Sequence, residues 1–229
     1  MTLGFRLLAI TPPTGAIDPA TVAAWSGAKS VGLAVLLRDP GTAIAELVAP
    51  AHRFAPLRRA CADAGIPCLL SVPPQVDASI GAVASTPGIV GCQLRGDPTA
   101  AQLDTARAHL PAGHCVGRSC HGTPPALGPR VDYSVLAPIF APHTTSAGPA
   151  KVAVGLEPLV ALCARQPFVF ALGGLTAARG EACLGAGAWG LAGIRSFFGV
   201  PGQVTDNVAR WVDRMAQPAD HAAPPRPDR

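Results

Sequence analysis

The sequence is poor in charge, and lysine is nearly missing from it. Only 14% of the 229 residues are charged, the formal net charge is +4, and the two lysines are Lys29 and Lys151. The arginines are scattered, and no basic run with interleaved aromatic residues occurs, which argues against nucleic-acid binding. Because 49% of the residues are hydrophobic, the chain can bury a large core and we expect order over most of its length.

Long apolar runs and paired cysteines are also missing. No apolar run reaches about 18 residues, and no cationic N-terminal segment precedes a small-residue cleavage site, so we expect neither a membrane span nor a secretion signal. The seven cysteines form no CxxC pair, and most lie within apolar runs. They are expected to be buried thiols of a cytoplasmic protein. The sequence leaves the oligomeric state open and allows a homo-oligomer.

Eight short apolar runs recur along the chain, separated for the most part by longer Ala-rich patterns with helical periodicity. Most of the runs are continuous, which is typical of parallel strands that are covered on both faces. The predicted strands are Phe5–Ile10, Gly32–Leu37, Cys68–Val72, Ile89–Leu94, Cys115–Ser119, Tyr133–Ala137, Phe168–Leu172 and Gly190–Ile194. The predicted helices are Pro19–Ala28, Thr42–Ala64 (broken by Pro50 and Pro56), Val76–Ala84, Ala100–His109, Leu156–Arg165, Ala177–Ala186 and Val204–Ala216.

This alternation predicts an α/β fold, a single-domain (β/α)8 TIM barrel over residues 1–216. An open doubly wound sheet is the alternative. The connection from Gly122 to Arg130 is short and Pro-rich, so we expect a degenerate connection without a full helix between the fifth and sixth strands. Residues 217–229 are polar and Pro-rich, and we expect a disordered tail there. In such a barrel, functional residues lie at the carboxyl ends of the strands.

Two neighbouring strand ends are rich in small residues. FALGGLT (170–176) ends the seventh strand, and GLAGIRSFF (190–198) contains the eighth, one helix later. Glycines there would let the backbone approach an anion closely, and Thr176 suits the N-cap of the next helix. Relief of crowding is the alternative explanation for the glycines. The predicted phosphate-binding residues are Gly173, Gly174, Ile194 and Arg195.

Three segments, in order, resemble thiamine phosphate synthases and their TenI-like relatives. VGRSCH (116–121) is similar to the family pattern IG-x-S-x-H, and DYSVLAPIFAPHTT (132–145) is similar to DY-x-x-x-GPIF-x-T-x-[TS]-K. ALGGLTAARGEACLGAGAWGLAGIRSFF (171–198) is similar to an IGGI-T strand end followed by GA-x-G-[VI]-A. The resemblance covers about residues 115–198, and the first half agrees with the family only in its strand rhythm.

The resemblance implies a small-molecule phosphate substrate, a thiazole phosphate, held at the glycine-rich strand ends. The synthases of the family join it to hydroxymethylpyrimidine pyrophosphate and form thiamine phosphate, with magnesium beside the departing pyrophosphate. The thiazole tautomerases of the TenI-like branch bind a thiazole carboxylate phosphate and move a proton without magnesium. Carried onto this sequence, the resemblance implies Arg38, Ser119 and Thr144 as catalytic residues and Asp97 as the ligand of a magnesium ion. His121 is a further predicted catalytic residue, although it does not match the position of the family's working histidine.

The family motifs are incomplete in this chain. LLRDP (36–40) retains the arginine of the family's Q-x-R-x-K but lacks its glutamine and lysine, and no Asn-Asp pair follows the third strand. Thr145 stands in place of the sixth-loop lysine, and Pro138 in place of the histidine that works in the tautomerases; His121 or His143 could substitute for it. Cys120 is disfavoured as a nucleophile because adjacent strand residues point apart.

Three functions therefore stay open on the sequence. One is a synthase with degenerate catalytic motifs, the second is a tautomerase, and the third is a catalytically impaired phosphate-binding or regulatory relative. A barrel isomerase or aldolase of another kind has less support, because no inward lysine or glutamate ends a predicted strand.

Overall fold

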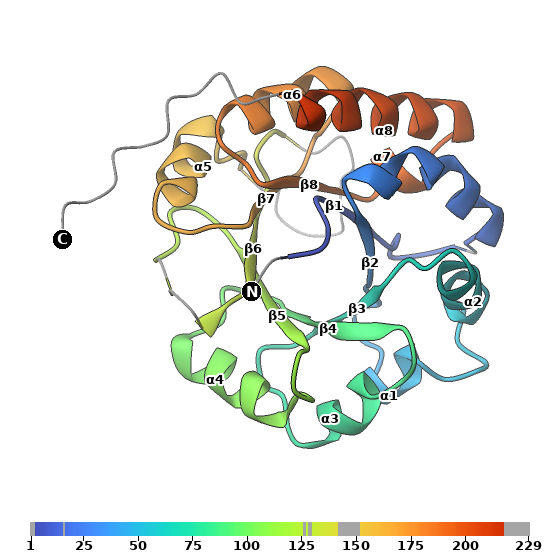
Figure 1. Cartoon of the computed structure of the whole chain (residues 1–229). Coiled ribbons are helices and arrows are strands. Elements are labelled where there is room, and N and C mark those ends of the chain that lie inside the picture. Colours follow the sequence, from blue (N-terminus) through green and yellow to red (C-terminus); the bar gives the residue numbers. More distant parts are fainter. Residues whose placement is uncertain (1–2, 16, 126, 128–129, 142–151, 218–229) are drawn as a thin grey trace.

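The chain forms a closed barrel of eight parallel strands in the order β1 to β8, with helices around the ring (Figure 1). The structure is a computed structural model that describes residues 3–15, 17–125, 127, 130–141 and 152–217. The predicted TIM barrel is confirmed, whereas residues 218–229 of the predicted tail lie outside the described residues. The strands are β1 Leu7–Ile10, β2 Leu33–Leu37, β3 Cys68–Val72, β4 Ile89–Leu94, β5 Cys115–Cys120, β6 Tyr133–Leu136, β7 Val169–Leu172 and β8 Gly190–Gly193.

The helices follow the predicted segments with three differences. The first, η1 (Pro19–Ser30), is a 3-10 helix, and the predicted helix 42–64 divides into α1 (Ile44–Leu47) and α2 (Ala55–Asp63), with Pro56 in the first turn of α2. A short helix that was not predicted, α7 (Arg195–Phe198), follows β8 directly. The remaining helices are α3 Ser79–Ala84, α4 Ala100–His109, α5 Leu156–Cys163, α6 Ala177–Gly185 and α8 Pro201–Ala216.

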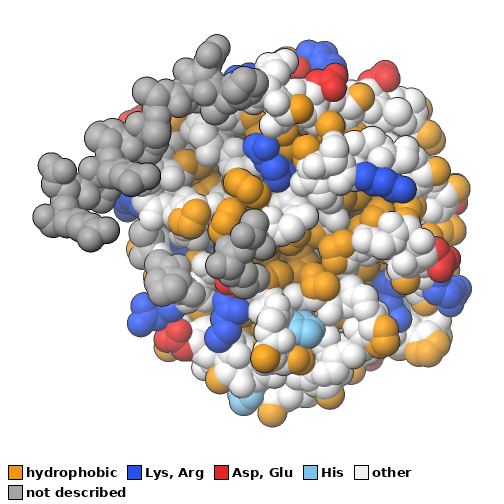
Figure 2. All heavy atoms as spheres, viewed as in Figure 1, with side chains coloured by type: hydrophobic (Ala, Val, Ile, Leu, Met, Phe, Trp, Pro, Cys, Tyr) orange, Lys and Arg blue, Asp and Glu red, His pale blue; other side chains and the backbone are white. Residues whose placement is uncertain are grey.

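The surface features agree with the composition. No helix in the described ranges has the length and apolarity needed to cross a membrane. On the face that Figure 2 views, Lys and Arg side chains are scattered and do not gather in one patch. All seven cysteines are free thiols, and six of them are buried.

Side chains alternate along each strand between the barrel interior and the layer under the helices. On β2, for example, Ala34 and Leu36 belong to the interior cluster, whereas Leu33, Val35 and Leu37 pack in the outer layer. This alternation determines which residues reach the mouth of the barrel at the carboxyl ends. The interior cluster also contains Leu8, Ile10, Leu69, Cys115, Tyr133, Val135, Phe170 and Ala192.

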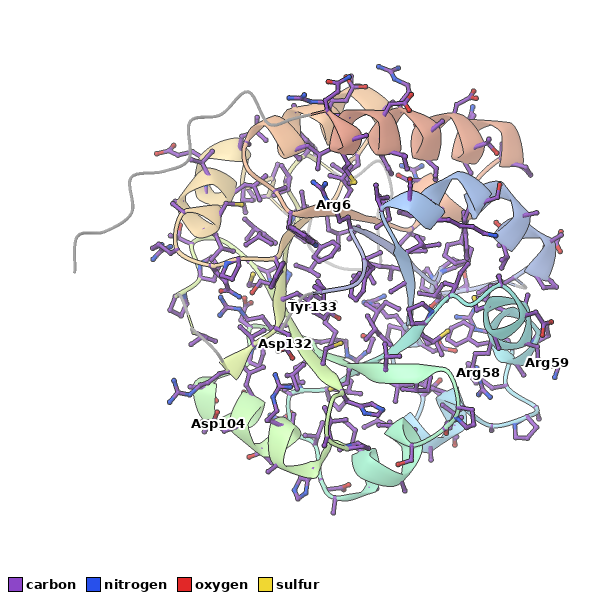
Figure 3. All side chains as sticks on the ribbon, viewed as in Figure 1. Arg6, Arg58, Arg59, Asp104, Asp132 and Tyr133 are labelled. Carbon is purple, nitrogen blue, oxygen red and sulfur yellow. The ribbon has the colours of Figure 1, made fainter. Side chains whose placement is uncertain are left out.

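Tyr133 fills the interior opposite a glycine of the neighbouring strand (Figure 3). A Cβ atom on Gly117 would lie 2.1 Å from Cζ of Tyr133, so no larger residue fits at position 117 beside this ring. The ring meets Phe5 and Phe170 edge-on, at centroid distances of 5.7 and 5.6 Å. The glycine of VGRSCH and the tyrosine of DYSVLAPIF are therefore complementary packing residues.

A buried arginine occupies the place where the fifth helix of a regular barrel would pack. The described residues between β5 and β6 contain no α-helix, as expected. Arg118 points outward from β5 and is only 2% exposed. Its guanidinium donates to Oγ of Ser134 at 2.8 Å, to the Pro125 carbonyl at 2.7 Å and to Oε1 of Gln166 at 3.0 Å. Arg118 thus ties the β5–β6 connection to the barrel in place of a helix.

We expect Arg118→Leu to destabilise the barrel, because the variant leaves the buried oxygens of Gln166 and Ser134 without this donor and removes the bond to the Pro125 carbonyl. The free energy of unfolding should fall by about 2–4 kcal/mol in chemical denaturation. Arg130→Leu is the matched control, since exposed Arg130 pairs with Asp104 at 3.2 Å and should contribute less than about 1 kcal/mol. Equal losses in the two variants would show that Arg118 does not replace the helix.

Candidate functional site

The mouth of the barrel is polar on one side and apolar on the other. Alternation places Ser71 of β3, Gln93 of β4 and Ser119 of β5 on the inward side below the mouth, and Arg38, Arg95 and His121 follow the same side just beyond β2, β4 and β5. On the other half, the inward positions near the ends of β6, β7 and β8 are Ala137, Leu172 and Ile194. Polar chemistry is thus concentrated over β2–β5.

Asp97 and His121 form a hydrogen-bonded dyad at the ends of β4 and β5. Oδ2 of Asp97 lies 2.7 Å from Nδ1 of His121, and Oδ1 accepts the backbone N–H of His121 at 2.7 Å. An ionised carboxylate only accepts hydrogen bonds, so Nδ1 carries the proton. In the neutral imidazole, Nε2 then has the free lone pair. This arrangement makes His121 a proton acceptor at Nε2.

The backbone at Asp97 is held in an unfavourable conformation that makes this contact. Asp97 has φ +55°, and Gly96 before it has φ +72°. Residues with side chains avoid this left-handed region, although aspartate tolerates it better than most. The turn directs both carboxylate oxygens back to His121. Strain of this kind often accompanies a functional site.

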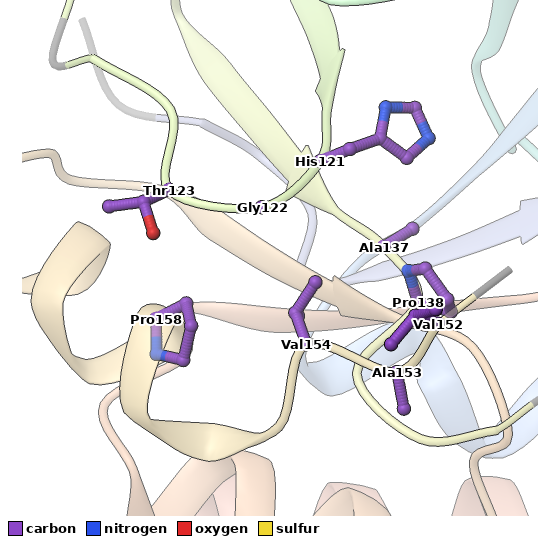
Figure 4. A pocket seen from close by; sticks show the side chains of 9 residues that line it. All are labelled: His121, Gly122, Thr123, Ala137, Pro138, Val152, Ala153, Val154 and Pro158. Atoms are coloured by element: carbon purple, nitrogen blue, oxygen red, sulfur yellow. The ribbon is translucent and has the colours of Figure 1, made fainter.

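His121 also lines a cavity of about 690 Å³ between the ends of β5 and β6 and the start of α5 (Figure 4). This volume is within the usual range for small-molecule sites. Its described wall is mostly apolar, and His121 is the one titratable residue in it. The other lining residues are Gly122, Thr123, Ala137, Pro138, Val152, Ala153, Val154 and Pro158.

Polar side chains also lie inside the barrel below the dyad. Nε2 of Gln93 donates to Oγ of Ser119 at 2.8 Å. Oε1 of Gln93 and Oγ of Ser71 are buried and have no hydrogen-bond partner among the described residues. Buried polar atoms are nearly always satisfied, so an unpartnered pair indicates a place for water or for a polar ligand group. Sequence analysis missed Gln93, although its inward position within a strand was a usable signal.

The predicted phosphate corner is formed by a tight turn after β7 that packs against the sixth loop. Gly173 and Gly174 have φ +107° and +61°. A Cβ atom on Gly174 would lie 2.7 Å from the carbonyl oxygen of Ala141. Arg179, which the sequence analysis did not single out, donates to the Gly174 carbonyl at 2.9 Å and lies over the Phe140 ring. The glycines thus relieve crowding here, which was the alternative explanation.

Backbone donors at this corner agree with an anion site as well. The N–H groups of Gly174 and Arg195 donate to no other described residue. Thr176 caps α6 by accepting the Arg179 N–H at 3.3 Å, as predicted. Arg195 is exposed and begins α7, with Ile194 before it. Phosphate binding by Gly173, Gly174, Ile194 and Arg195 stays a prediction.

The other predicted residues are only partly gathered by the fold. Thr144 and His143 lie outside the described residues. Arg38 is half-buried at the end of β2, and Ser119 points into the barrel, whereas Cys120 points outward. Burial raises the pKa of the Cys120 thiol to about 12, which keeps it protonated and unreactive.

The described donor set does not fit a magnesium site. In these residues no group of three His, Cys, Asp or Glu side chains could hold a metal ion. Asp97 gives both of its oxygens to His121, and Asp39, which follows β2, accepts from Arg53 at 3.0 Å and lies 3.3 Å from His52. Asp18 and Asp77 accept backbone N–H groups at the starts of η1 and α3. Two arginines, Arg38 and Arg95, directly follow β2 and β4 and add positive charge at this end of the barrel. We therefore derive no step through magnesium.

Fold and site define a TIM barrel whose polar groups meet at the carboxyl ends of β2–β5, with an Asp-His dyad among them. The chain belongs to the thiamine monophosphate synthase family, because its sequence matches that family over residues 33–197. The resemblance to thiamine phosphate synthases and TenI-like proteins is thereby confirmed at the level of the family. No curated protein matches the chain significantly.

Solved structures share the fold at low sequence identity. Thiamine phosphate pyrophosphorylase from Pyrococcus furiosus has a TM-score of 0.63 and 16% identity, over 93% of this chain and 98% of that chain. The enzyme of the same name from Bacteroides thetaiotaomicron has a TM-score of 0.57 and 18% identity, over 93% and 98%. Phosphoribosyl anthranilate isomerase from Thermotoga maritima has a TM-score of 0.60 and 11% identity, over 92% and 98%. These likenesses establish the fold and no activity.

We expect Gly174→Ala to lower the free energy of unfolding by about 2–3 kcal/mol, because its new Cβ atom would press on the Ala141 carbonyl. Gly122→Ala is the matched control. Gly122 has φ +60°, close to that of Gly174, but its Cβ atom would meet nothing within 4 Å. Only backbone strain of about 1 kcal/mol is expected there. Chemical denaturation measures the free energy of unfolding of both variants. If Gly174→Ala lowers it no more than Gly122→Ala does, Gly174 is not crowded by the Ala141 carbonyl.

Proposed function

We propose that the protein catalyses proton transfer on a phosphorylated heterocycle, as the thiazole tautomerases of its family do. The observation that carries the proposal is the Asp97–His121 dyad, in which 2.7 Å contacts fix the imidazole beside the cavity. The substrate class is a small ring that bears a phosphate. The glycine corner between β7 and β8 is the proposed phosphate site.

His121 is the proposed acid–base residue. Its Nε2 removes a proton from one ring position of the substrate, and the resulting imidazolium returns a proton at a second position. The Asp97 carboxylate keeps the ring oriented and stabilises the imidazolium, as carboxylates do for histidines in other enzymes. The reaction is an isomerisation, so no group leaves the substrate. The proposed step therefore develops no leaving-group charge that a metal ion would have to stabilise.

The proposed role of His121 compensates for Pro138. In the tautomerases the working histidine precedes the phenylalanine of the sixth strand end by two residues, and proline at that position moves no proton. Pro138 and His121 line the same cavity, and the His121 ring points away from Thr123 and Pro158 (Figure 4). The proposal assigns to His121, just after β5, the proton transfer that a residue after β6 performs in the tautomerases. The dyad thus supplies the missing function from the neighbouring strand.

Formation of thiamine phosphate has weaker support. That reaction has to stabilise a departing pyrophosphate, and the residues near Asp97 do not fit the magnesium that the family uses. We therefore place synthase activity, with Arg38, Ser119 and Thr144 as catalytic residues, behind tautomerisation. The small-molecule substrate, the cytoplasmic location and a homo-oligomer stay predictions from the sequence.

The test is interconversion of the two tautomers of thiazole carboxylate phosphate by the purified full-length protein, followed by NMR in deuterated buffer. His121→Asn should lower kcat by at least about 100-fold with little change in KM, because general acid–base catalysis contributes 10²–10⁴-fold. Asp97→Asn should lower kcat by roughly tenfold or more, since the amide no longer imposes the productive imidazole tautomer.

His109→Asn is the control, because His109 is an exposed residue at the end of α4, and its rates should equal those of the parent. The same samples are assayed for thiamine phosphate formation with and without magnesium. Full tautomerase activity in His121→Asn would overturn the proposal. Rapid, magnesium-dependent thiamine phosphate formation without tautomer exchange would establish the synthase instead.

A further inference from the structure

Two successive peptide carbonyls in the turn between β7 and α6 are bound by other parts of the chain. The Gly173 carbonyl accepts the backbone N–H of Phe140, in the loop after β6, at 3.2 Å. The Gly174 carbonyl accepts Nη1 of Arg179, in the first turns of α6, at 2.9 Å. These two bonds fix the orientation of both peptide groups.

The N–H groups of the same two peptides point the other way. In a trans peptide the carbonyl and the following N–H lie on opposite sides, so the Gly174 N–H points away from Phe140 and the Leu175 N–H points away from Arg179. Neither N–H donates to another described residue. β6 and β8 flank β7 on opposite sides in the closed ring (Figure 1). Both N–H groups therefore point away from the sixth loop and toward the side on which β8 ends.

Arg179 is held at both ends of its side chain. Its backbone N–H donates to Oγ1 of Thr176 at 3.3 Å, which fixes its place in the first turn of α6. Its guanidinium carbon lies 5.0 Å from the centroid of the Phe140 ring, within the range of a cation–π contact. The guanidinium thus lies on the sixth-loop side of the turn and binds the Gly174 carbonyl from there.

The charge of Arg179 is not neutralised by any of the ion pairs between described residues. Glu181, two residues later on α6, pairs with Arg210 at 2.9 Å. A charged donor on a carbonyl polarises the peptide and strengthens the N–H on its other side as a donor. Arg179 therefore acts on the Leu175 N–H through the peptide group between them.

We propose that Arg179 is a positioning residue for phosphate binding. It holds the Gly174–Leu175 peptide so that the Leu175 N–H joins the Gly174 N–H in binding the phosphate group of the substrate. The inference rests on the phosphate corner of the proposed function and adds to it a donor, Leu175, and the residue that fixes this donor. None of the family motifs above assigns a role to either. Because the guanidinium lies behind the peptide, its charge attracts phosphate without taking the place of the backbone donors.

The test is titration of the 15N-labelled full-length protein with inorganic phosphate, followed through its amide resonances by NMR. In the parent, phosphate should shift the amide resonances of Gly174 and Leu175. Arg179→Gln should bind phosphate about tenfold more weakly and lose most of the Leu175 shift, because the peptide is no longer held by a charged donor. Arg179→Lys should retain most of the binding, since an ammonium group also donates to a carbonyl.

A double variant, Ala178→Arg with Arg179→Gln, separates position from charge. Ala178 is exposed, and adjacent helix residues do not face the same side, so the variant restores the net charge without the bond to the Gly174 carbonyl. It should bind phosphate as weakly as Arg179→Gln does. Arg210→Gln removes an exposed charge that pairs with Glu181, and it should bind as the parent does. Circular dichroism confirms that each variant is folded.

The outcomes distinguish this inference from the proposed function. Parent-like affinity and an unchanged Leu175 shift in folded Arg179→Gln would exclude the positioning role and leave the phosphate corner standing. Recovery of the parent affinity in the double variant would show that charge alone acts, which also overturns the inference. If phosphate shifts neither Gly174 nor Leu175 in the parent, the phosphate corner itself fails and the inference with it. The acid–base role of His121 is decided by the tautomer assay in every case.

Discussion

The interior of this barrel depends on the packing of Tyr133 against Gly117. Eight short strands enclose a narrow space, and one large ring from β6 fills it where β5 contributes no side chain. Asp132 secures the same point from outside, because its carboxylate accepts the Val116 N–H at 2.7 Å and pairs with Arg107 of α4. β5 and β6 are thereby held in register, and β5 carries both Ser119 and His121 to the mouth.

Much of the fold was predictable because its physics is local. Continuous apolar runs identified all eight strands, and their alternation with helices implied parallel closure. Thr99 and Thr176 cap α4 and α6 as threonine does at many helix starts. The 3-10 geometry of η1 and the short α7 were not predictable in this way, since tertiary packing decides between helix types over such short segments.

The candidate site was predictable only in part, because its contacts join residues that are distant in sequence. Asp97 and His121 were both selected, yet as a metal ligand and as a separate catalytic residue. Their union depends on the left-handed turn at Asp97, which composition does not reveal. Arg95 and Gln93 were not predicted as site residues. Which residues of β4 point into the barrel is seen only from its pairing with β3 and β5. Arg118 escaped because its partners Ser134 and Gln166 come from later elements.

The left-handed turn at Asp97 lowers the stability of the fold and positions the carboxylate that holds His121. A left-handed backbone costs a residue with a side chain about 1 kcal/mol, and glycine would remove that cost. Selection for stability alone would therefore favour a second glycine after Gly96. The chain instead carries an aspartate whose carboxylate is half-exposed and contributes little to packing. We interpret the aspartate as a partner that the His121 imidazole requires. Selection of variants for stability alone would therefore tend to replace Asp97 and remove the dyad.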